Sequence, residues 1–390
     1  MRLTGTSAHG VRLPIISTGD NLPAIVAEAV ANATAAEKLT LKNTDVIGVT
    51  ESIVAKAQGN YASTDDLAAD IRAKFPGGVV GVVFPIFSRN RFVNILKGIA
   101  KGADKVYVLM NCPNDEVGNP IIDLDDIDRI SPAFANGPVP AAQFRVLSNN
   151  FLHPFTDMDY MDLYEKAGAN IEVFVSNDPR SILTLTDTVL VGEIHSRFRT
   201  KKRLEAAGAK TVYTLSDILT APINGSGFNA QYGVLGSNLS TDSRLKLFPR
   251  DCEAFVEKTR ALITEKTGIT PEVLVYGDGA FKDPVCGIWE LADPVVSPAY
   301  TPRLGGQPSE IKLKFVADNM FGHLSGDEKT KAVADMIKAK ESGKATHSEG
   351  TTPRKYADLL GSLCDLISGS GDKGTPVILI QGYFDDYVAE

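Results

Sequence analysis

The most constraining feature of this chain is a run of alternating strand and helix patterns that starts at Val79. VVGVVFPIF (79–87) is a continuous apolar run typical of a buried strand, FVNILKGIAKG (92–102) has helical periodicity, and KVYVLM (105–110) is apolar again. This order predicts two parallel strands joined by a right-handed crossover. Later, DLYEKAGANIEVFV and RLEAAGAKTVYTL repeat the helix–Gly–Ala–strand order without a strict period. The chain is therefore expected to contain an α/β lobe of similar units rather than a repeat array.

Clear signals also lie on both sides of this stretch. GDNLPAIVAEAVANAT predicts a helix capped by Asp20, and DVIGVT predicts a strand that leads directly into the helix ESIVAKAQG. Near the C-terminus, the strands VLVY and PVILIQGY each follow a helical pattern, the first of which runs from Asp251 to Gly268. Residues 121–144 form an acidic run and then a Pro/Gly-rich connection, which predicts a boundary between lobes.

Composition and charge narrow the range of partners. The net charge of −8 and the pI near 5.3 argue against nucleic acid, because phosphate backbones need a basic surface. No apolar run approaches the roughly 20 residues that span a bilayer, and MRLTGTSAHG lacks the apolar centre of a signal peptide, so we expect a cytoplasmic protein without membrane contact. The four cysteines lie far apart without a CxxC pair and the five histidines are scattered, so a zinc site or a disulfide framework has little support.

Two features could bring phosphate groups to the chain. GSGDKG (369–374) formally fits GxGxxG, but a dinucleotide fingerprint leaves a strand and opens a helix, whereas here a helix comes first. It reads as a helix-to-strand turn in which glycine supplies positive φ, although its backbone N–H groups can still approach phosphates. Lys56 is either a solvated surface residue or a cation that reaches a phosphate held near the start of its helix.

Two charged clusters allow more than one interpretation. HSRFRTKKR (195–203) either attracts an anionic substrate or forms a solvated helix start or an interface patch. The acidic run of Asp123, Asp125, Asp126 and Asp128 lacks the spacing of an EF-hand loop and reads as a solvated turn.

Asp278 is the sharpest single candidate. It stands between Gly277 and Gly279 directly after the apolar run Val273–Tyr276. Ligands of α/β sheets gather beyond the carboxyl ends of strands, so this carboxylate could meet one. An Asx-turn with its own backbone would produce the same pattern, and the pattern does not separate the two.

Five segments occur in an order that points to a known family. They are RLPIISTGDNL, DVIGVTESIVAKAQG, NAQYGVLGSN, LFPRDCEAFVEKTRALITEKTGITPEVLVYGDGAFKD and KYADLLGSLCDLISGSGDKGTPVILIQG. Together they resemble the coenzyme F-420 γ-glutamyl ligase family (coenzyme F-420-0:L-glutamate ligases). The resemblance implies an α/β (α+β) fold with a discontinuous ligase-like core, residues 1–60 and 228–390. Residues 61–227 would then be an inserted α/β lobe, and the chain would form a homodimer.

The resemblance also implies a function. The family joins L-glutamate to a carboxylate acceptor, by default coenzyme F-420-0, although a folate-like or other carboxylate would use the same core. GTP, or ATP, activates that carboxylate as an acyl phosphate, and Mg or Mn is implied because charge develops on phosphate oxygens. Lys56 and Asp278 are the implied catalytic residues, and Asp278 is also the implied metal ligand. The implied nucleotide-binding residues are Leu13, Pro14, Ile15, Ile16, Glu51, Ser52, Lys56, Asn238, Ser368, Gly369, Ser370, Gly371, Asp372, Lys373, Gly374 and Thr375.

Some positions depart from the family pattern. Leu235 stands where the family has its first metal-binding aspartate, Gly279 stands where it has threonine, and Lys282 stands where it usually has arginine. Residues that could substitute for the missing carboxylate are Asp242, Asp283 and acids within residues 61–227.

Two other functions stay open. The departures favour a non-catalytic relative that binds a nucleotide or a metabolite through a degraded metal site. An NAD-type oxidoreductase built on the strand–helix units is weaker, because no glycine fingerprint follows VVGVVFPIF.

Overall fold

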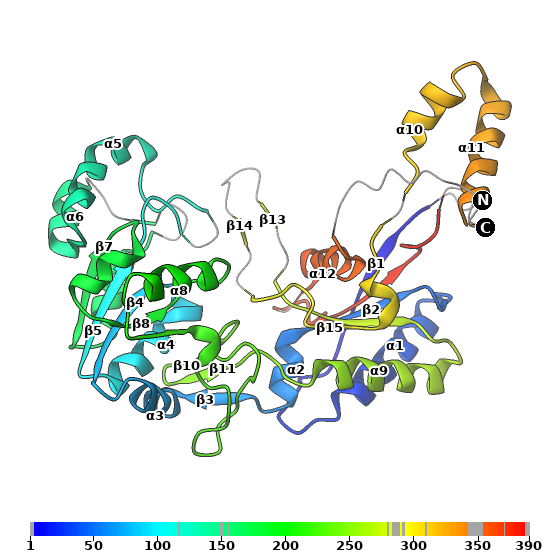
Figure 1. Cartoon of the computed structure of the whole chain (residues 1–390). Coiled ribbons are helices and arrows are strands. Elements are labelled where there is room, and N and C mark those ends of the chain that lie inside the picture. The colour runs from blue at the N-terminus through cyan, green and yellow to red at the C-terminus, as the bar shows by residue number, and fades with distance from the viewer. Residues whose placement is uncertain are drawn as a thin grey trace.

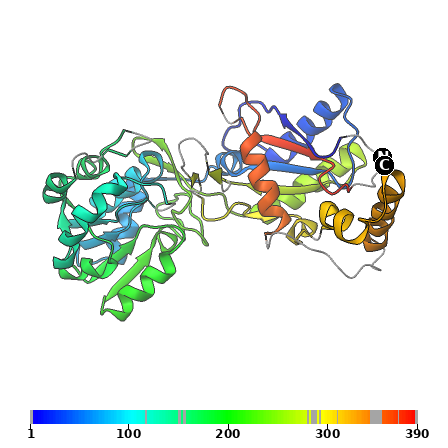
Figure 2. The ribbon, with the colours of Figure 1, turned by 90° about the horizontal axis from the view of Figure 1, so that it is seen from above.

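The computed structural model describes residues 4–115, 118–148, 152–153, 157–278, 281–282, 289–290, 293–308, 310–341, 354–369 and 371–386. These residues form two lobes that lie side by side, each built on one sheet (Figures 1 and 2). We call them the five-stranded lobe and the six-stranded lobe. The fold is mixed α/β, as the sequence predicts.

The five-stranded lobe combines residues from both ends of the chain. Its strands lie in the order β1 (Ser7–Val11), β16 (Val377–Gln381), β2 (Val46–Thr50), β12 (Glu272–Tyr276) and β15 (Ala299–Tyr300). Only β2 and β12 are parallel, and both are almost wholly buried. Helices α1 (Leu22–Ala36) and α9 (Cys252–Thr267) pack on one face, and α12 (Tyr356–Ile367) packs on the other. Because both faces are covered, the central strands are continuous apolar runs.

The six-stranded lobe contains the strand–helix units that begin at Val79. Its strands lie in the order β6 (Val139–Pro140), β7 (Ile171–Val175), β5 (Lys105–Met110), β4 (Val79–Val83), β8 (Thr188–Val191) and β9 (Thr211–Thr214). All neighbours from β7 to β9 are parallel, which confirms the predicted parallel pair of β4 and β5. The order reverses between β4 and β8, as in a doubly wound sheet.

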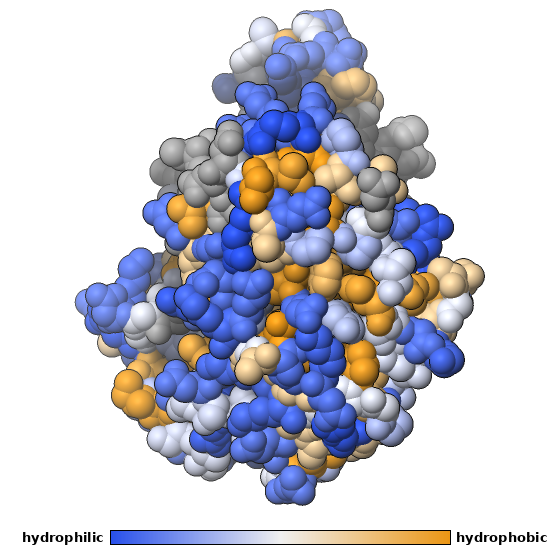
Figure 3. All heavy atoms as spheres, turned by 90° about the vertical axis from the view of Figure 1, so that its left-hand side faces the viewer, coloured by the Kyte–Doolittle hydropathy of each residue, from blue (hydrophilic) through white to orange (hydrophobic). Residues whose placement is uncertain are grey.

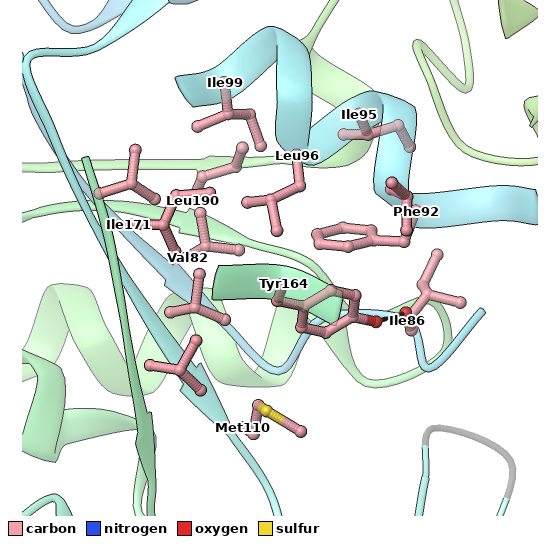
Figure 4. Packing of buried hydrophobic residues seen from close by; sticks show 14 of the residues in the cluster. Val82, Ile86, Phe92, Ile95, Leu96, Ile99, Met110, Tyr164, Ile171 and Leu190 are labelled. Atoms are coloured by element: carbon pink, nitrogen blue, oxygen red, sulfur yellow. Dashed lines mark hydrogen bonds between the residues drawn. The ribbon is translucent and has the colours of Figure 1, made fainter. Parts of the chain in front are cut away.

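Helices cover both faces of this sheet. Helices α3 (Thr64–Lys74), α4 (Arg89–Gly102) and α7 (Tyr160–Glu165) contribute to one core, and α8 (Arg197–Ala206) to the other. In the first core Phe92 and Leu96 of α4 pack near Tyr164 and Val82 (Figure 4). The Tyr164 hydroxyl donates to the carbonyl of Ile86, so its one polar group is satisfied inside the core. Helix α4 is therefore packed into a well-filled core.

Smaller elements lie between and around the sheets. Strand β3 (Tyr61–Ser63) pairs with β11 (Arg244–Lys246), which pairs with β10 (Asn238–Thr241), while β13 (Phe281–Lys282) pairs with β14 (Trp289–Glu290). The remaining helices are α2 (Glu51–Ala57), α5 (Ile127–Ile130), α6 (Ala141–Leu147), α10 (Leu313–Phe315) and α11 (Gly326–Glu341). The 3-10 helices are Leu124–Asp126, Ser131–Asn136, Pro179–Thr184, Leu215–Asp217 and Pro302–Gly305, and Val316–Met320 is a π-helix.

Two local predictions are wrong. Residues 121–144 are not a boundary between lobes, because β6 joins the six-stranded sheet and Ile121, Ile130 and Phe144 lie in that lobe's core. Asp20 does not cap α1, which begins at Leu22, because its carboxylate accepts the Ser17 N–H at 2.6 Å instead. By contrast, the described residues of GSGDKG, all but Ser370, lie between the end of α12 and β16 with Gly374 at φ +62°, as predicted for a helix-to-strand turn.

The outer surface of the six-stranded lobe is mixed in character. Hydrophilic residues cover much of the face seen in Figure 3, with hydrophobic residues interspersed among them. Within the described part of the chain, no helix is both long enough and apolar enough to cross a membrane.

Candidate active site

The parallel pair of β2 and β12 places two acidic residues at one edge of the five-stranded sheet. Glu51 is the first residue of α2 and follows β2 directly, and Asp278 comes two residues after β12. Pro376 lies at the same edge, since its carbonyl accepts the Thr50 N–H at 3.1 Å. The start of β16 and the glycine-rich turn before it therefore meet the carboxyl ends of β2 and β12.

Arg91 comes to this edge from the six-stranded lobe. It lies in the first turn of α4, where its own N–H donates to the Ser88 side chain at 3.3 Å. Its Nη1 donates to Asp293 Oδ1 at 2.8 Å, and its Nη2 donates to Asp278 Oδ2. The Arg91 side chain is only 12% exposed, whereas the Asp278 side chain is 38% exposed, so the cation is shielded from water while Asp278 stays partly open to it.

Asp293 is completely buried beside Asp278. Its Oδ2 accepts the Asp278 backbone N–H at 2.8 Å. A Cβ on Gly277 would lie 2.3 Å from the same oxygen, so only glycine allows the strand end to approach this carboxylate. That contact explains the glycine before Asp278. Burial raises the pKa of the Asp293 carboxyl, and the Arg91 guanidinium opposes the rise.

Glu51 and Lys246 form the second half of the site. Lys246 Nζ lies 3.6 Å from Glu51 Oε2 and donates to Ser52 Oγ at 2.5 Å. The pKa of Glu51 is raised to about 7. Burial is the largest cause, Asp293 and Asp278 add to the rise, and Lys246 and Arg91 oppose it. Among the described residues, Glu51 Oε2 accepts no hydrogen bond. A buried carboxyl with a pKa near neutrality can take up or release a proton under ordinary conditions.

The five residues Glu51, Arg91, Lys246, Asp278 and Asp293 are hereafter the charged cluster. Arg91 also marks a strand end of the six-stranded sheet, because α4 follows β4 directly in the chain. The strand order reverses beside β4, and ligands of such sheets usually bind at this position. The loop from β4 to α4 is Phe84–Ser88 and contains no glycine, so it does not support the dinucleotide-type hypothesis.

The predicted nucleotide-binding segments partly converge on this edge. The Leu13 N–H donates to the Gly374 carbonyl at 3.3 Å, which joins the segment Leu13–Ile16 to the glycine-rich turn. Pro14 and Thr375 border a cavity of about 820 Å³, together with residues of α1 such as Ala29 and Ala33. A cavity of this volume is large enough for a small organic ligand.

The other residues predicted to bind nucleotide or metal lie in several parts of the structure. Asn238 pairs with Lys246 across β10 and β11, so it lies beside the charged cluster. The carbonyl of Lys56 accepts the Thr18 hydroxyl at 3.3 Å, and its side chain has no ion pair among the described residues. Ser368 closes α12 through its N–H. Ser370, Gly279 and Asp283 lie outside the described residues, and the Lys282 side chain does too.

The metal site predicted at Asp278 stays a prediction, and the structure describes two of the other positions considered for it. Leu235 is fully buried in the core of the six-stranded lobe and provides no ligand. Asp242 is exposed in the turn between β10 and β11, where its carbonyl accepts from Lys97. In the described part of the chain, no three His, Cys, Asp or Glu side chains are close enough together to hold a metal ion. Asp278 instead contacts a guanidinium.

The two charged runs of the sequence form ion pairs within the six-stranded lobe. Within HSRFRTKKR, Arg203 pairs with Asp178 at 3.1 Å and Lys201 approaches Asp217 at 3.9 Å, all within the six-stranded lobe. In the acidic run, Asp126 pairs with Arg129 at 2.7 Å. Exposed pairs of this kind contribute little to stability and are typical of solvated helix ends.

Sequence patterns missed three members of the charged cluster: Arg91, Lys246 and Asp293. Arg91 carried a usable signal, since a cation in the first turn of a helix after a buried parallel strand lies at a ligand-binding edge. Lys246 and Asp293 carry no local signal, because a short strand and an irregular segment place them.

Comparison with known proteins identifies one family. The model of a family described as F420-0:gamma-glutamyl ligase matches residues 10–382. This range includes residues 61–227, for which the sequence motifs showed no resemblance. A search of curated proteins finds no match to the chain.

Proposed function

Because the chain belongs to the F420-0:gamma-glutamyl ligase family, we propose that it joins L-glutamate to a carboxylate acceptor at the expense of a nucleoside triphosphate. Coenzyme F-420-0 is the first acceptor to test. The acceptor carboxylate attacks the terminal phosphorus of GTP or ATP, and the nucleoside diphosphate leaves. The glutamate amine then attacks the resulting acyl phosphate, an amide bond forms, and inorganic phosphate leaves.

The charged cluster is the observation that carries this proposal. It combines two shielded cations, Arg91 and Lys246, with a carboxyl of raised pKa, at an edge where two parallel strands end. Phosphoryl and acyl transfer both need positive groups where negative charge develops on oxygen. The guanidinium and the ammonium would provide that charge, and Lys56 would add to it from α2.

Glu51 is the proposed general base. The ammonium group of glutamate must lose a proton before it can attack, and a base with a pKa near the working pH does this best. Burial supplies that pKa, and Oε2 is free of hydrogen bonds among the described residues.

The nucleoside is proposed to bind at the 820 Å³ cavity bordered by Pro14 and Thr375. The glycine-rich turn adjoins this cavity at Thr375, so its backbone N–H groups would contact the phosphates. The choice between GTP and ATP, the participation of Mg or Mn, and the homodimer stay predictions. The steps above use only the cations of the chain.

The experiment is a phosphate-release assay with GTP or ATP, L-glutamate and coenzyme F-420-0. Release should require all three substrates and should coincide with a product that carries one added glutamyl residue. A thermal-shift titration is the companion measurement, because a ligand at about 100 times its Kd stabilises by about 2.7 kcal/mol. The proposal is wrong if neither nucleotide binds with Mg or Mn present.

A second candidate function is a non-catalytic nucleotide or metabolite binder. It is favoured by Leu235 in the core and by the ion pair that occupies Asp278. This candidate predicts nucleotide binding without any turnover of an acceptor, and Glu51→Gln would then leave every measurable property except stability unchanged.

A further inference from the structure

Within the charged cluster, two carboxylates contact one guanidinium and a third carboxyl group lies nearby. Asp278 and Asp293 each accept a hydrogen bond from Arg91, and Glu51 lies near enough to attract it electrostatically. Carboxylates gathered at strand ends are the oxygen ligands that Mg²⁺ and Mn²⁺ prefer. We infer that Arg91 is the permanent cation of this cluster and takes the place of a protein-held divalent metal ion.

The contacts of Arg91 support this assignment. Its two Nη atoms reach two different carboxylates, so the planar fork bridges Asp278 and Asp293 much as a shared ion would. Both oxygens of Asp293 are already engaged, one by Arg91 and one by the Asp278 N–H. A magnesium ion needs nearly octahedral oxygen ligands at roughly 2.0–2.1 Å, and the guanidinium occupies that space.

Arg91 is also held in place more firmly than a flexible surface arginine. Its helix is anchored by Phe92, Ile95 and Leu96, which pack into the core of the six-stranded lobe (Figure 4). The next turn of α4 is bonded to β10, because Asn94 Nδ2 donates to the Thr241 carbonyl at 2.8 Å. The cation therefore reaches the cluster already oriented, with little side-chain freedom left to lose.

The three carboxyl groups and their cation come from different lobes. Glu51, Asp278 and Asp293 adjoin the five-stranded sheet, whereas Arg91 belongs to the six-stranded lobe. The six-stranded lobe would thus complete the charged cluster by supplying the positive charge of Arg91. Two of the five N–H groups of the guanidinium donate within the described chain, which leaves donors for an anionic ligand.

The test is a titration of the nucleotide-free full-length chain with Mn²⁺, followed by electron paramagnetic resonance. The wild type and Asp278→Asn should bind Mn²⁺ equally weakly, because Asp278 has no metal to lose. Arg91→Met, which keeps most of the volume and removes the charge, should bind Mn²⁺ at least about tenfold more tightly than the wild type. The double variant Arg91→Met/Asp278→Asn should lose that gain.

Two results would overturn the inference. One is a wild-type chain that binds Mn²⁺ tightly and loses this binding in Asp278→Asn. The other is a folded Arg91→Met variant, checked by circular dichroism, that gains no Mn²⁺ site. If Arg91→Met does not fold, the comparison of the wild type with Asp278→Asn decides alone. Neither nucleotide nor acceptor is present, so the result does not depend on the proposed ligase activity.

Discussion

Replacing Glu51 by glutamine should stabilise the folded chain in alkaline solution and have little effect in acid. The glutamate is fully buried, and burial raises the pKa of its carboxyl from 4.5 to about 7. Glutamine has nearly the same shape and stands for the protonated acid at every pH. The variant therefore isolates what it costs to ionise this one group inside the protein.

The size and sign of the effect follow from the pKa of Glu51. A shift from 4.5 to about 7 corresponds to about 3 kcal/mol of unfolding free energy. Below pH 4.5 the Glu51 carboxyl is protonated in both the folded and the unfolded state, so it costs the folded state no stability. Between 4.5 and about 7 only the folded state keeps the proton, and the stability of the wild type falls as pH rises. Above about pH 7 the carboxyl is ionised in both states, and the wild type has lost the full amount of about 3 kcal/mol.

Urea unfolding from about pH 5 to about pH 8.5 measures this difference. The variant should gain up to about 3 kcal/mol over the wild type across this range, and Glu205→Gln, at an exposed position of α8, should show no such trend. A difference that stays flat with pH, or a wild type that gains stability relative to the variant as pH rises, would refute the reasoning.

Three further predictions concern the same site. Gly277→Ala should cost about 1–3 kcal/mol in unfolding free energy, because its Cβ would meet Asp293, whereas Gly77→Ala, with open space around its Cβ, should change it by less than about 0.5 kcal/mol. If Glu51 is the base, the ligase rate should rise with pH through about 7, and Glu51→Gln should lower it by about 10²–10⁴-fold. Lys246→Met removes the charge that most lowers the pKa of Glu51, so the midpoint of that pH–rate profile should move to higher pH; an unmoved midpoint would exclude Glu51 as the titrating group.

Much of the fold was predictable because its signals are local. The buried strands and their helices show periodicity within short windows, and β4 and β5 are parallel as predicted. The error at residues 121–144 has a physical reason. Ile121, Ile130 and Phe144 reach the core from short helices and loops, so their spacing matches neither a helical nor a strand period.

The site was predictable only in part, because sequence patterns record only residues that are close along the chain. Asp278 could be identified because the glycine before it and the end of its strand are adjacent in sequence. Its partner Arg91 lies 187 residues away, and Asp293 lies 202 residues from Arg91. Such contacts depend on how two lobes meet, which no local pattern records. The sequence therefore pointed to Asp278 but not to the guanidinium that contacts it, and the metal ion expected there stays a prediction.

Transfer of oxygen from the acceptor to phosphate tests the central claim most directly. The acceptor carboxylate is labelled with oxygen-18 and incubated with the chain, GTP or ATP, and L-glutamate, and the released phosphate is analysed by mass spectrometry. An acyl phosphate route predicts one labelled oxygen in each phosphate released and one new amide bond for each. Amide formation with unlabelled phosphate, or phosphate release without an amide, would contradict the account.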